Sequence, residues 1–427
     1  MNNLVVRNEQ KEVKLMEDLE KAKKILQQYK QQHILETLEK INEKEKNKLV
    51  KQILECDFKK LNDIYNSRET QNTNNKINPM EFIDKLKLSK DEKDELDKLG
   101  EEIIKNNQYA VVTMAGGQGT RLGCDGPKGS FKLDIGEKGK YIFELLVETL
   151  KRAKAQYGTE VYWYIMTSNQ NNQQTIDFFE NNNFFGYNKE KVKFFIQGEL
   201  PLLTLDGEVV LDENYNIKTA SNGNGSVYES LKKSGMLEDM KSKNIKWVYI
   251  CGVDNIMAQM VDSTLLGLAI KKKVSGAAKA IRKAYPEEKV GIFCKSNEKP
   301  RVIEYIDMTE DMIYAKNDNG ELLYGLSYFV SNLLKIEAIE EIAKHELKYH
   351  CALKKNMYKF ESFIFDGFEF LDDMAIMEVD RNEEFAPIKN ATGVDSPATA
   401  IQIYERNLKN EIWYWLLFWR NRRKWNI

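Results

Sequence analysis

A glycine-rich loop follows directly on a short apolar run in this sequence. Residues 114–129 read MAGGQGTRLGCDGPKG and hold six of the 24 glycines of the chain, and the run YAVVTM (109–114) leads into them. Glycine permits positive φ angles and lets backbone N–H groups approach a ligand that a Cβ atom would keep away. A loop of this kind at the carboxyl end of a strand is a candidate cradle for phosphate groups.

Two familiar nucleotide-binding patterns do not fit this loop. The dinucleotide pattern G-x-G-x-x-G needs a third glycine where Leu122 stands, and the next expected strand ends in TSN (167–169) without the acidic residue that holds a ribose. The Walker pattern needs a lysine after its last glycine, but Cys124 follows Gly123. The sequence therefore argues against a hydride-transfer enzyme and against a P-loop NTPase.

The loop carries its own positive charges. Arg121 lies inside it, and Lys128 follows after a turn that Pro127 and Gly129 stiffen. Fixed cations beside backbone amides offset the charge of a triphosphate while a nucleophile attacks it. The alternative is an ordinary surface turn with solvated charges, but the combination of GGQGTRLG with GPKG favours a phosphate site.

The spacing of apolar residues divides the chain into three parts. Residues 1–107 are rich in Lys and Glu with apolar residues at helical spacing, which predicts an all-helical N-terminal lobe. In 108–390, short β-branched or aromatic runs alternate with amphipathic stretches, which predicts an α/β domain with a mostly parallel sheet covered on both faces. We expect 391–427 to form a small C-terminal lobe that ends in a helix.

Charge and cysteine content limit the possible partners and location. The 64 Lys and Arg nearly balance the 66 Asp and Glu, so the broad positive field of a non-specific nucleic-acid binder is missing. The five cysteines show no paired CxxC spacing, which is typical of a reduced intracellular protein. The N-terminal residues predict no signal peptide, and no apolar run reaches the roughly 20 residues of a membrane span. We expect a cytoplasmic protein with no nucleic-acid partner and no stable membrane association.

The end of the sequence is apolar and then basic, WYWLLFW (413–419) followed by RNRRKWNI. We expect a terminal helix that docks on the core. Contact of this tail with a membrane surface is the alternative.

The glycine loop resembles the signature of the UDP-sugar pyrophosphorylases, specifically the eukaryotic-type UDP-N-acetylglucosamine pyrophosphorylases and their bacterial relatives. The likeness continues in order through residues 109–400. The matching segments are FFIQGELP (194–201), NGNGSVY (222–228), CGVDN (251–255), VGIFC (290–294), VIEY (302–305), FESFIFD (360–366) and EEFAPIKNA (383–391).

The resemblance implies both a fold and an activity. The fold is a Rossmann-like nucleotide-diphospho-sugar transferase of the GT-A-like type, a mixed sheet with N- and C-terminal lobes. The activity is uridylyl transfer: with Mg²⁺, UTP and a sugar 1-phosphate give a UDP-sugar and pyrophosphate. No covalent enzyme nucleophile is needed, because the sugar phosphate itself attacks the α-phosphorus.

The resemblance also assigns roles to single residues. The nucleotide is wrapped by Met114, Ala115, Gly116, Gly117 and Gly119. Its phosphates meet the catalytic cations Arg121, Lys128 and Lys389. Gln197 faces uracil, whose edge an amide reads by donating and accepting at once, with Gly223 beside it. The sugar is held by Asn224, Gly291, Glu304 and Tyr305.

Asp254 is the expected metal ligand. It closes the run IKWVYICGVDN (245–255), where an oxygen ligand for a hard divalent cation would lie at the mouth of the sheet. By itself such an Asp also fits a helix N-cap or a turn, and Lys389 fits a solvated lysine after a proline. The family motifs favour the metal role for Asp254 and the phosphate role for Lys389.

One segment departs from the family pattern. Members of the N-acetylglucosamine type usually carry an NAGN-like segment after a Leu-Leu pair, but this chain has LLYGLSYFV (322–330), with Gly325 and Tyr328 at the asparagine positions. We predict N-acetylglucosamine 1-phosphate as the acceptor. The alternatives are a UDP-glucose or UDP-galactose pyrophosphorylase, or a catalytically silent sugar-nucleotide sensor, against which the retained charged residues argue. Oligomeric state is not indicated.

Overall fold

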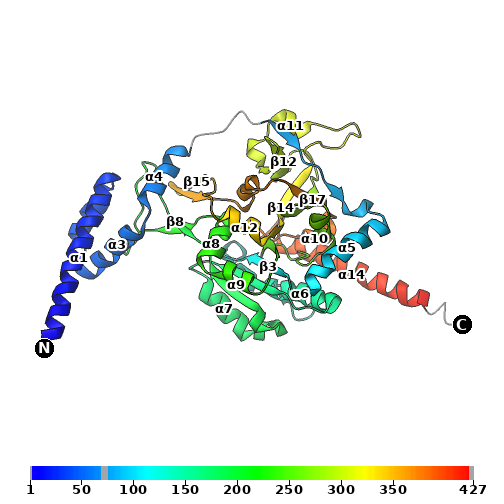
Figure 1. Ribbon diagram of the computed structural model, residues 1–427, viewed down its shortest axis with the longest axis horizontal. Coiled ribbons are helices and arrows are strands. Elements are labelled where there is room, and N and C mark those ends of the chain that lie inside the picture. Colours follow the sequence, from blue (N-terminus) through cyan, green and yellow to red (C-terminus); the bar gives the residue numbers. More distant parts are fainter. Residues whose placement is uncertain (1, 69–75, 423–427) are drawn as a thin grey trace. The chain divides into compact units, whose positions relative to one another are not determined.

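The computed structural model describes residues 2–68 and 76–422, with side chains in 13–68 and 76–409 (Figure 1). Its contacts group the chain into two compact units. Unit 1 consists of Met1–Thr73, Gly198–Gly225 and Leu347–Phe363. Unit 2 consists of Asn74–Gln197, Ser226–Glu346 and Ile364–Ile427. The chain therefore leaves unit 1 and returns to it twice.

The described residues of unit 1 form four α-helices and two small antiparallel strand pairs. The helices are α1 (Asn2–Gln28), α2 (Gln32–Lys40), α3 (Glu43–Glu55) and α4 (Phe58–Ser67), and the strand pairs are β8 (Glu199–Pro201) with β9 (Thr219–Ser221) and β15 (His350–Lys354) with β16 (Met357–Glu361). One core holds apolar residues from all three chain segments, among them Leu38, Leu203 and Phe360. The helices alone thus do not complete this core.

Unit 2 is built on an eleven-stranded mixed sheet whose main order is β2-β17-β11-β14-β10-β3-β6-β7. Its strands and the small pair β4–β5 are β1 (Ile77–Pro79), β2 (Ile83–Asp84), β3 (Tyr109–Met114), β4 (Lys132–Leu133), β5 (Lys140–Tyr141), β6 (Tyr162–Thr167), β7 (Val192–Ile196), β10 (Trp247–Gly252), β11 (Gly276–Arg282), β12 (Ile292–Ser296), β13 (Lys299–Ile303), β14 (Leu326–Lys335) and β17 (Met374–Glu378). Strands β10, β3, β6 and β7 run parallel, whereas β14 is antiparallel to both its neighbours β10 and β11.

Helices cover both faces of this sheet (Figure 1). The helices described in unit 2 are α5 (Lys90–Lys105), α6 (Ile142–Tyr157), α7 (Asn172–Asn181), α8 (Val227–Lys233), α9 (Met236–Ser242), α10 (Ser263–Lys271), α11 (Glu310–Tyr314), α12 (Ile336–Ile342), α13 (Arg381–Glu384) and α14 (Pro397–Arg422). All six residues of β3 are buried, which is the pattern of a strand covered on both sides. Tyr109 and Val111 share a core with α5, α6 and α10, while Tyr164 on β6 donates a hydrogen bond to Asp239 of α9 (2.7 Å).

Helix α5 belongs to unit 2, although its composition resembles that of the N-terminal helices. It packs closely on α10, since a Cβ atom on Gly267 would lie 1.8 Å from the carbonyl oxygen of Leu96. Composition alone does not reveal which core a helix joins, so the border predicted at residue 107 does not coincide with a border between the two units. The division into three functional domains stays a prediction. The aromatic tail from 413 lies outside the residues with described side chains.

Candidate active site

Four parallel strands of unit 2 end at one edge of the sheet. The register pairs Met114 at the end of β3 with Gly252 of β10 and Met166 of β6, and it pairs Thr167 with Ile196 of β7. In open α/β sheets, ligands bind outside the carboxyl ends of the strands. The segments that follow these four strands therefore form the candidate site.

The glycine loop after β3 closes on itself. The N–H of Ala115 donates to the Met166 carbonyl (2.7 Å), that of Gly119 to Gly126 (2.9 Å), and that of Lys128 to Gly117 (3.1 Å). Within the described part of the chain, the N–H groups of Gly116 and Gly117 donate to no acceptor. A Cβ atom on Gly117 would meet nothing within 4 Å. The loop thus leaves two backbone amides without a described acceptor, as an anion site requires.

Asn171 holds this loop in place, a role that the sequence alone did not reveal. It is fully buried, and its side-chain amide donates to the carbonyls of Ala115 (3.0 Å) and Gly117 (3.3 Å). Its Oδ1 accepts from the N–H of Ser168 (2.8 Å). The available signal was a polar run directly after an apolar strand. That run excludes a ribose-binding carboxylate but does not show which of its side chains turns toward the loop.

The predicted phosphate and metal residues influence one another electrostatically in the structure. Lys128 is half-buried, and burial together with the charges of Lys389 and Arg121 lowers the pKa of its ammonium group, while Asp254 acts in the opposite direction. Arg121 itself is exposed. The structure thus brings Arg121, Lys128, Asp254 and Lys389 together, although they lie on three separate segments.

Asp254 and Lys389 are joined through their main chains. The N–H of Ile388 donates to the Asp254 carbonyl (2.9 Å), and Asn255 pairs with Pro387 in an isolated antiparallel bridge. The Asp254 carboxylate has no hydrogen bond or ion pair with any described residue. The Lys389 ammonium, in contrast, pairs with the Asp395 carboxylate (3.0 Å) at the surface. This pair uses one of the three N–H donors of the ammonium.

Gln197 lies against the glycine loop, as its predicted role requires. Its N–H donates to the Thr167 carbonyl (2.8 Å), which continues the pairing of β7 with β6. A Cβ atom on Gly116 would lie 2.6 Å from the Gln197 Nε2, so only glycine leaves space for this amide. Among the described residues the amide has no hydrogen-bond partner, although the side chain is buried. An amide that has no partner at the end of a mostly buried side chain suits a ligand that both donates and accepts.

The predicted sugar residues fall into two groups. In unit 2, Gly291 and Glu304 lie close together, since a Cβ atom on Gly291 would lie 3.7 Å from the Glu304 carboxylate, and Tyr305 follows on an exposed turn. Tyr328, at a position that departs from the family pattern, donates its N–H to the Gly291 carbonyl (2.8 Å). Burial and the charges of Asp366 and Glu304 raise the pKa of its phenol, although a hydrogen bond from Asn332 opposes them. The hydroxyl is therefore a neutral group next to these residues.

Gly223 and Asn224 belong to unit 1. A Cβ atom on Gly223 would lie 2.1 Å from the Ser362 carbonyl oxygen, and its φ is +93°, so both the space and the backbone require glycine. Packing within unit 1 therefore explains why position 223 is a glycine. The roles of Gly223 and Asn224 at the base and the sugar stay predictions.

Comparison with known proteins identifies the family. The model of the UTP–glucose-1-phosphate uridylyltransferase family matches residues 47–404 of this chain. The chain belongs to this family. The predicted kinship with the UDP-sugar pyrophosphorylases is thereby confirmed, and so is the predicted enzyme class, a UTP:sugar-1-phosphate uridylyltransferase.

Three relatives illustrate the likeness within the family. The UDP-N-acetylglucosamine diphosphorylase 2 of Arabidopsis thaliana is 36% identical over 73% of this chain and 67% of its own length. The UDP-N-acetylglucosamine pyrophosphorylase of Saccharomyces cerevisiae is 35% identical over 72% of this chain and 70% of its own. The crystal structure of the Trypanosoma brucei enzyme of that name superposes with a TM-score of 0.78 at 30% identity, covering 90% of this chain and 84% of that one. The predicted Rossmann-like transferase fold is confirmed by this match.

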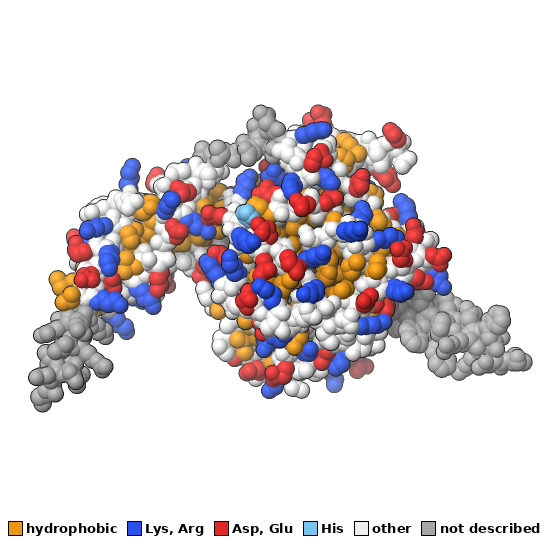
Figure 2. All heavy atoms as spheres, in the orientation of Figure 1, with side chains coloured by type: hydrophobic (Ala, Val, Ile, Leu, Met, Phe, Trp, Pro, Cys, Tyr) orange, Lys and Arg blue, Asp and Glu red, His pale blue; other side chains and the backbone are white. Residues whose placement is uncertain are grey.

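Three further observations concern metal ligands, membrane-spanning helices and surface charge in the described residues. These residues contain no group of three or more His, Cys, Asp and Glu side chains that would hold a metal ion unaided. None of the described helices combines the length and apolar character needed to cross a bilayer. On the face that Figure 2 shows, basic and acidic side chains are interspersed. The prediction of no nucleic-acid partner stays untested by these observations.

Proposed function

We propose that this chain transfers the uridylyl group of UTP to N-acetylglucosamine 1-phosphate and releases pyrophosphate. One observation carries the proposal: the unpaired backbone amides of Gly116 and Gly117 lie at the same sheet edge as three cationic side chains and one unpaired carboxylate. These side chains are Arg121, Lys128, Lys389 and Asp254. The acceptor follows the names of the relatives, which are UDP-N-acetylglucosamine pyrophosphorylases or diphosphorylases. A cytoplasmic location remains our expectation.

In the proposed reaction, a phosphate oxygen of the sugar 1-phosphate attacks the α-phosphorus of UTP. The bond from the α-phosphorus to the oxygen that bridges the α- and β-phosphates breaks, and pyrophosphate leaves with the electron pair. The loop amides and Lys128 stabilise the negative charge on the α-phosphate as it builds up, and Arg121 and Lys389 offset the charge of the leaving group. Gln197 orients the uracil. Positioning and charge therefore do the catalytic work.

Magnesium fits the residues at this edge. Mg²⁺ is usually held by one or two carboxylates together with substrate phosphates and water, and Asp254 supplies one carboxylate without a protein partner. We propose that Asp254 would hold the ion, which would supply further charge neutralisation at the phosphates. A larger set of protein ligands is not needed for this type of site.

The test measures pyrophosphate release from UTP with a panel of sugar 1-phosphates, in the wild type and in Asp254→Asn. We expect the fastest release with N-acetylglucosamine 1-phosphate, a loss of orders of magnitude in Asp254→Asn, and little change in the matched control Asp134→Asn, an exposed carboxylate after the loop. Faster release with glucose or galactose 1-phosphate would establish the alternative acceptor. Binding of a UDP-sugar without any release would establish a sensor.

A further inference from the structure

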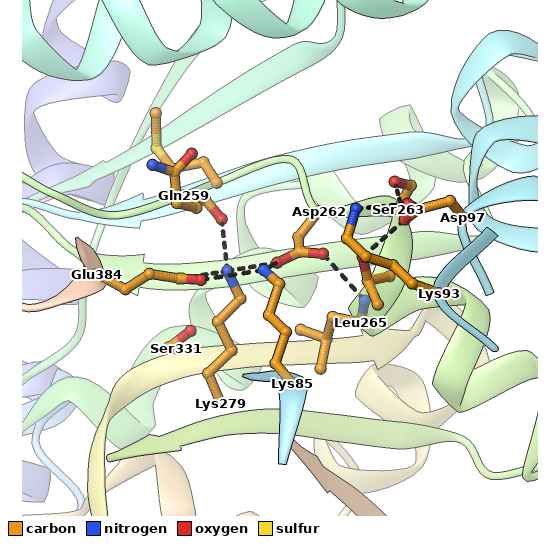
Figure 3. A network of polar contacts seen from close by, with 12 residues as sticks. Lys85, Lys93, Asp97, Gln259, Asp262, Ser263, Leu265, Lys279, Ser331 and Glu384 are labelled. Carbon is orange, nitrogen blue, oxygen red and sulfur yellow. Dashed lines mark hydrogen bonds and ion pairs between the residues drawn. The ribbon is translucent and has the colours of Figure 1, made fainter. Parts of the chain in front are cut away.

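A cluster of four charged side chains, three of them buried and Lys85 partly exposed, lies within unit 2 (Figure 3). Lys279 is fully buried and pairs with Asp262 (2.8 Å) and with Glu384, whose side chains are each 6% exposed. Lys85 pairs with the same two carboxylates, at 3.0 Å from Asp262 and 3.2 Å from Glu384. The Lys279 ammonium also donates to the Gln259 carbonyl (3.2 Å). Two positive and two negative charges thus balance in the interior.

This cluster is expensive to bury, so its presence calls for a reason beyond stability. Moving charges out of water costs several kcal/mol per ion, and apolar replacements of a whole buried pair are often neutral or stabilising. The pairing is nevertheless tight: against the effect of burial, Lys279 and Lys85 hold the pKa of Asp262 well below its usual range. The four residues come from distant segments, the loop before α5 (Lys85), the start of α10 (Asp262), β11 (Lys279) and the end of α13 (Glu384).

Glu384 connects the cluster to the active-site edge. Its main-chain carbonyl accepts a hydrogen bond from the Asn255 amide (2.7 Å). The same Asn255 accepts from the N–H of Ala386 (2.9 Å) through its Oδ1. Asn255 directly follows Asp254, and Ala386 leads to Lys389. The side chain of Glu384 is therefore anchored in the cluster, while its main chain is fixed next to Asp254.

We propose that Glu384, held by Lys279 and Lys85, is a positioning residue that fixes segment 385–389 against the end of β10. The cluster thereby sets the distance between Asp254 and Lys389. These two residues lie on different segments, and both are proposed to act at the phosphates of UTP. The inference rests on the proposed function for the roles of these two residues. A misplacement of about 1 Å at such groups lowers turnover by on the order of 100-fold.

The test compares single, double and control variants. Lys279→Met or Glu384→Met alone leaves a buried charge unbalanced and is expected to unfold at a lower temperature. The double variant Lys279→Met/Glu384→Met keeps the Lys85–Asp262 pair and is expected to recover thermal stability. The control Asp97→Asn weakens hydrogen bonds from Ser263 and Thr264 (2.7 and 2.6 Å), which directly follow Asp262, but Asp97 itself has no described hydrogen bond or ion pair with Glu384 or segment 385–389.

Turnover, magnesium dependence and hydrogen exchange decide the outcome in the stable double variant. We expect kcat to fall by roughly 10- to 100-fold with a smaller change in KM for UTP, and half-maximal activity to require more Mg²⁺. Amide exchange in a peptide covering 385–390 should become about tenfold faster. None of these changes is expected in Asp97→Asn.

Two results would overturn the inference. One is a double variant with wild-type kcat and an unchanged magnesium midpoint, which would make the cluster purely structural. The other is unchanged amide exchange over 385–390, which would show that Glu384 does not hold this segment. Hydrogen exchange needs no substrate. If the wild-type protein had no transferase activity, the proposed function would be refuted, but amide exchange over 385–390 would still test whether Glu384 holds this segment.

Discussion

Lys128 is the residue at which stability and activity are expected to oppose each other. Burial and the neighbouring charges of Lys389 and Arg121 disfavour its ammonium form in the absence of substrate. The phosphates of UTP would reverse this balance. Lys128→Met keeps an unbranched side chain of similar length and removes the charge. We therefore expect a variant that is at least as stable as the wild type but much slower.

The expected loss can be estimated from what such a donor contributes to catalysis. A single fixed group that stabilises developing charge supplies about 2 to 4 kcal/mol, which corresponds to roughly 30- to 900-fold in kcat. The assay combines steady-state kinetics, UTP affinity by calorimetry and thermal unfolding, with Lys132→Met, an exposed lysine nearby, as the control. If UTP affinity collapses while kcat at saturation stays normal, Lys128 is only a tether. If the variant unfolds at a lower temperature, the view that its charge is disfavoured is wrong.

The lowered pKa of Lys128 also gives a pH dependence with a definite sign. Its pKa in the folded protein lies below the ordinary value of 10.5. Between these two pKa values the folded state binds fewer protons than the unfolded state, so stability increases with pH. The destabilisation caused by the buried ammonium therefore disappears as the pH rises. The stability gain of Lys128→Met over the wild type should therefore be present at neutral pH and shrink at alkaline pH. For the wild type, kcat/KM should decrease as the pH rises, with a midpoint below 10.5. The decrease in kcat should have its midpoint at a higher pH, because bound phosphates raise the pKa of Lys128.

Three further predictions concern the residues around the loop. Gln197→Ala should raise KM for UTP and reduce the preference for UTP over other triphosphates by a few kcal/mol; an unchanged preference in competition assays would mean that another group reads the base. Asn171→Ala removes the side-chain donor of the Ala115 carbonyl and one of the two donors of the Gly117 carbonyl, and it should cost about 1 to 3 kcal/mol in unfolding free energy and raise KM for UTP; a change in stability with unaltered KM would restrict Asn171 to a structural role. Gly129→Ala places a Cβ atom 2.2 Å from the Phe143 ring and should destabilise the fold by about 1 to 3 kcal/mol in chemical denaturation; a variant of wild-type stability would show that the ring moves aside at no cost.

The glycine loop and the strands around it could be predicted because their signals are local. The apolar run YAVVTM and the glycines after it are contiguous, and each subsequent strand is a short run of its own. Because the strands are parallel, their carboxyl ends meet at one edge of the sheet, which brings Gln197 and Asp254 to the edge where Lys128 lies. This placement follows from the strand pattern alone. The segments that meet at the site were therefore within reach of sequence reasoning, although the roles of their residues stay predictions.

The remaining features depend on contacts between distant segments. Asn171 is one of several polar residues in a row, and nothing in that row shows which side chain turns toward the loop. Lys279 and Glu384 lie 105 positions apart, and a lysine inside the apparently ordinary strand GAAKAIR gives no sign of a buried partner. The pairing of Lys389 with Asp395 likewise depends on how the loop between them turns. These relations exist only after the chain has folded.

The interrupted course of unit 1 has a consequence for how the protein is made. The helices up to residue 67 leave the ribosome well before Leu203, Ile217 and Phe360, which complete their core, have been synthesised. The last segment of the unit ends at Phe363, about 290 residues after Thr73, which corresponds to roughly 15 to 60 s of translation. During that interval the apolar faces of α2, α3 and α4 lack their final cover, so a nascent chain stalled within unit 2 should be a target for chaperones that recognise exposed helices.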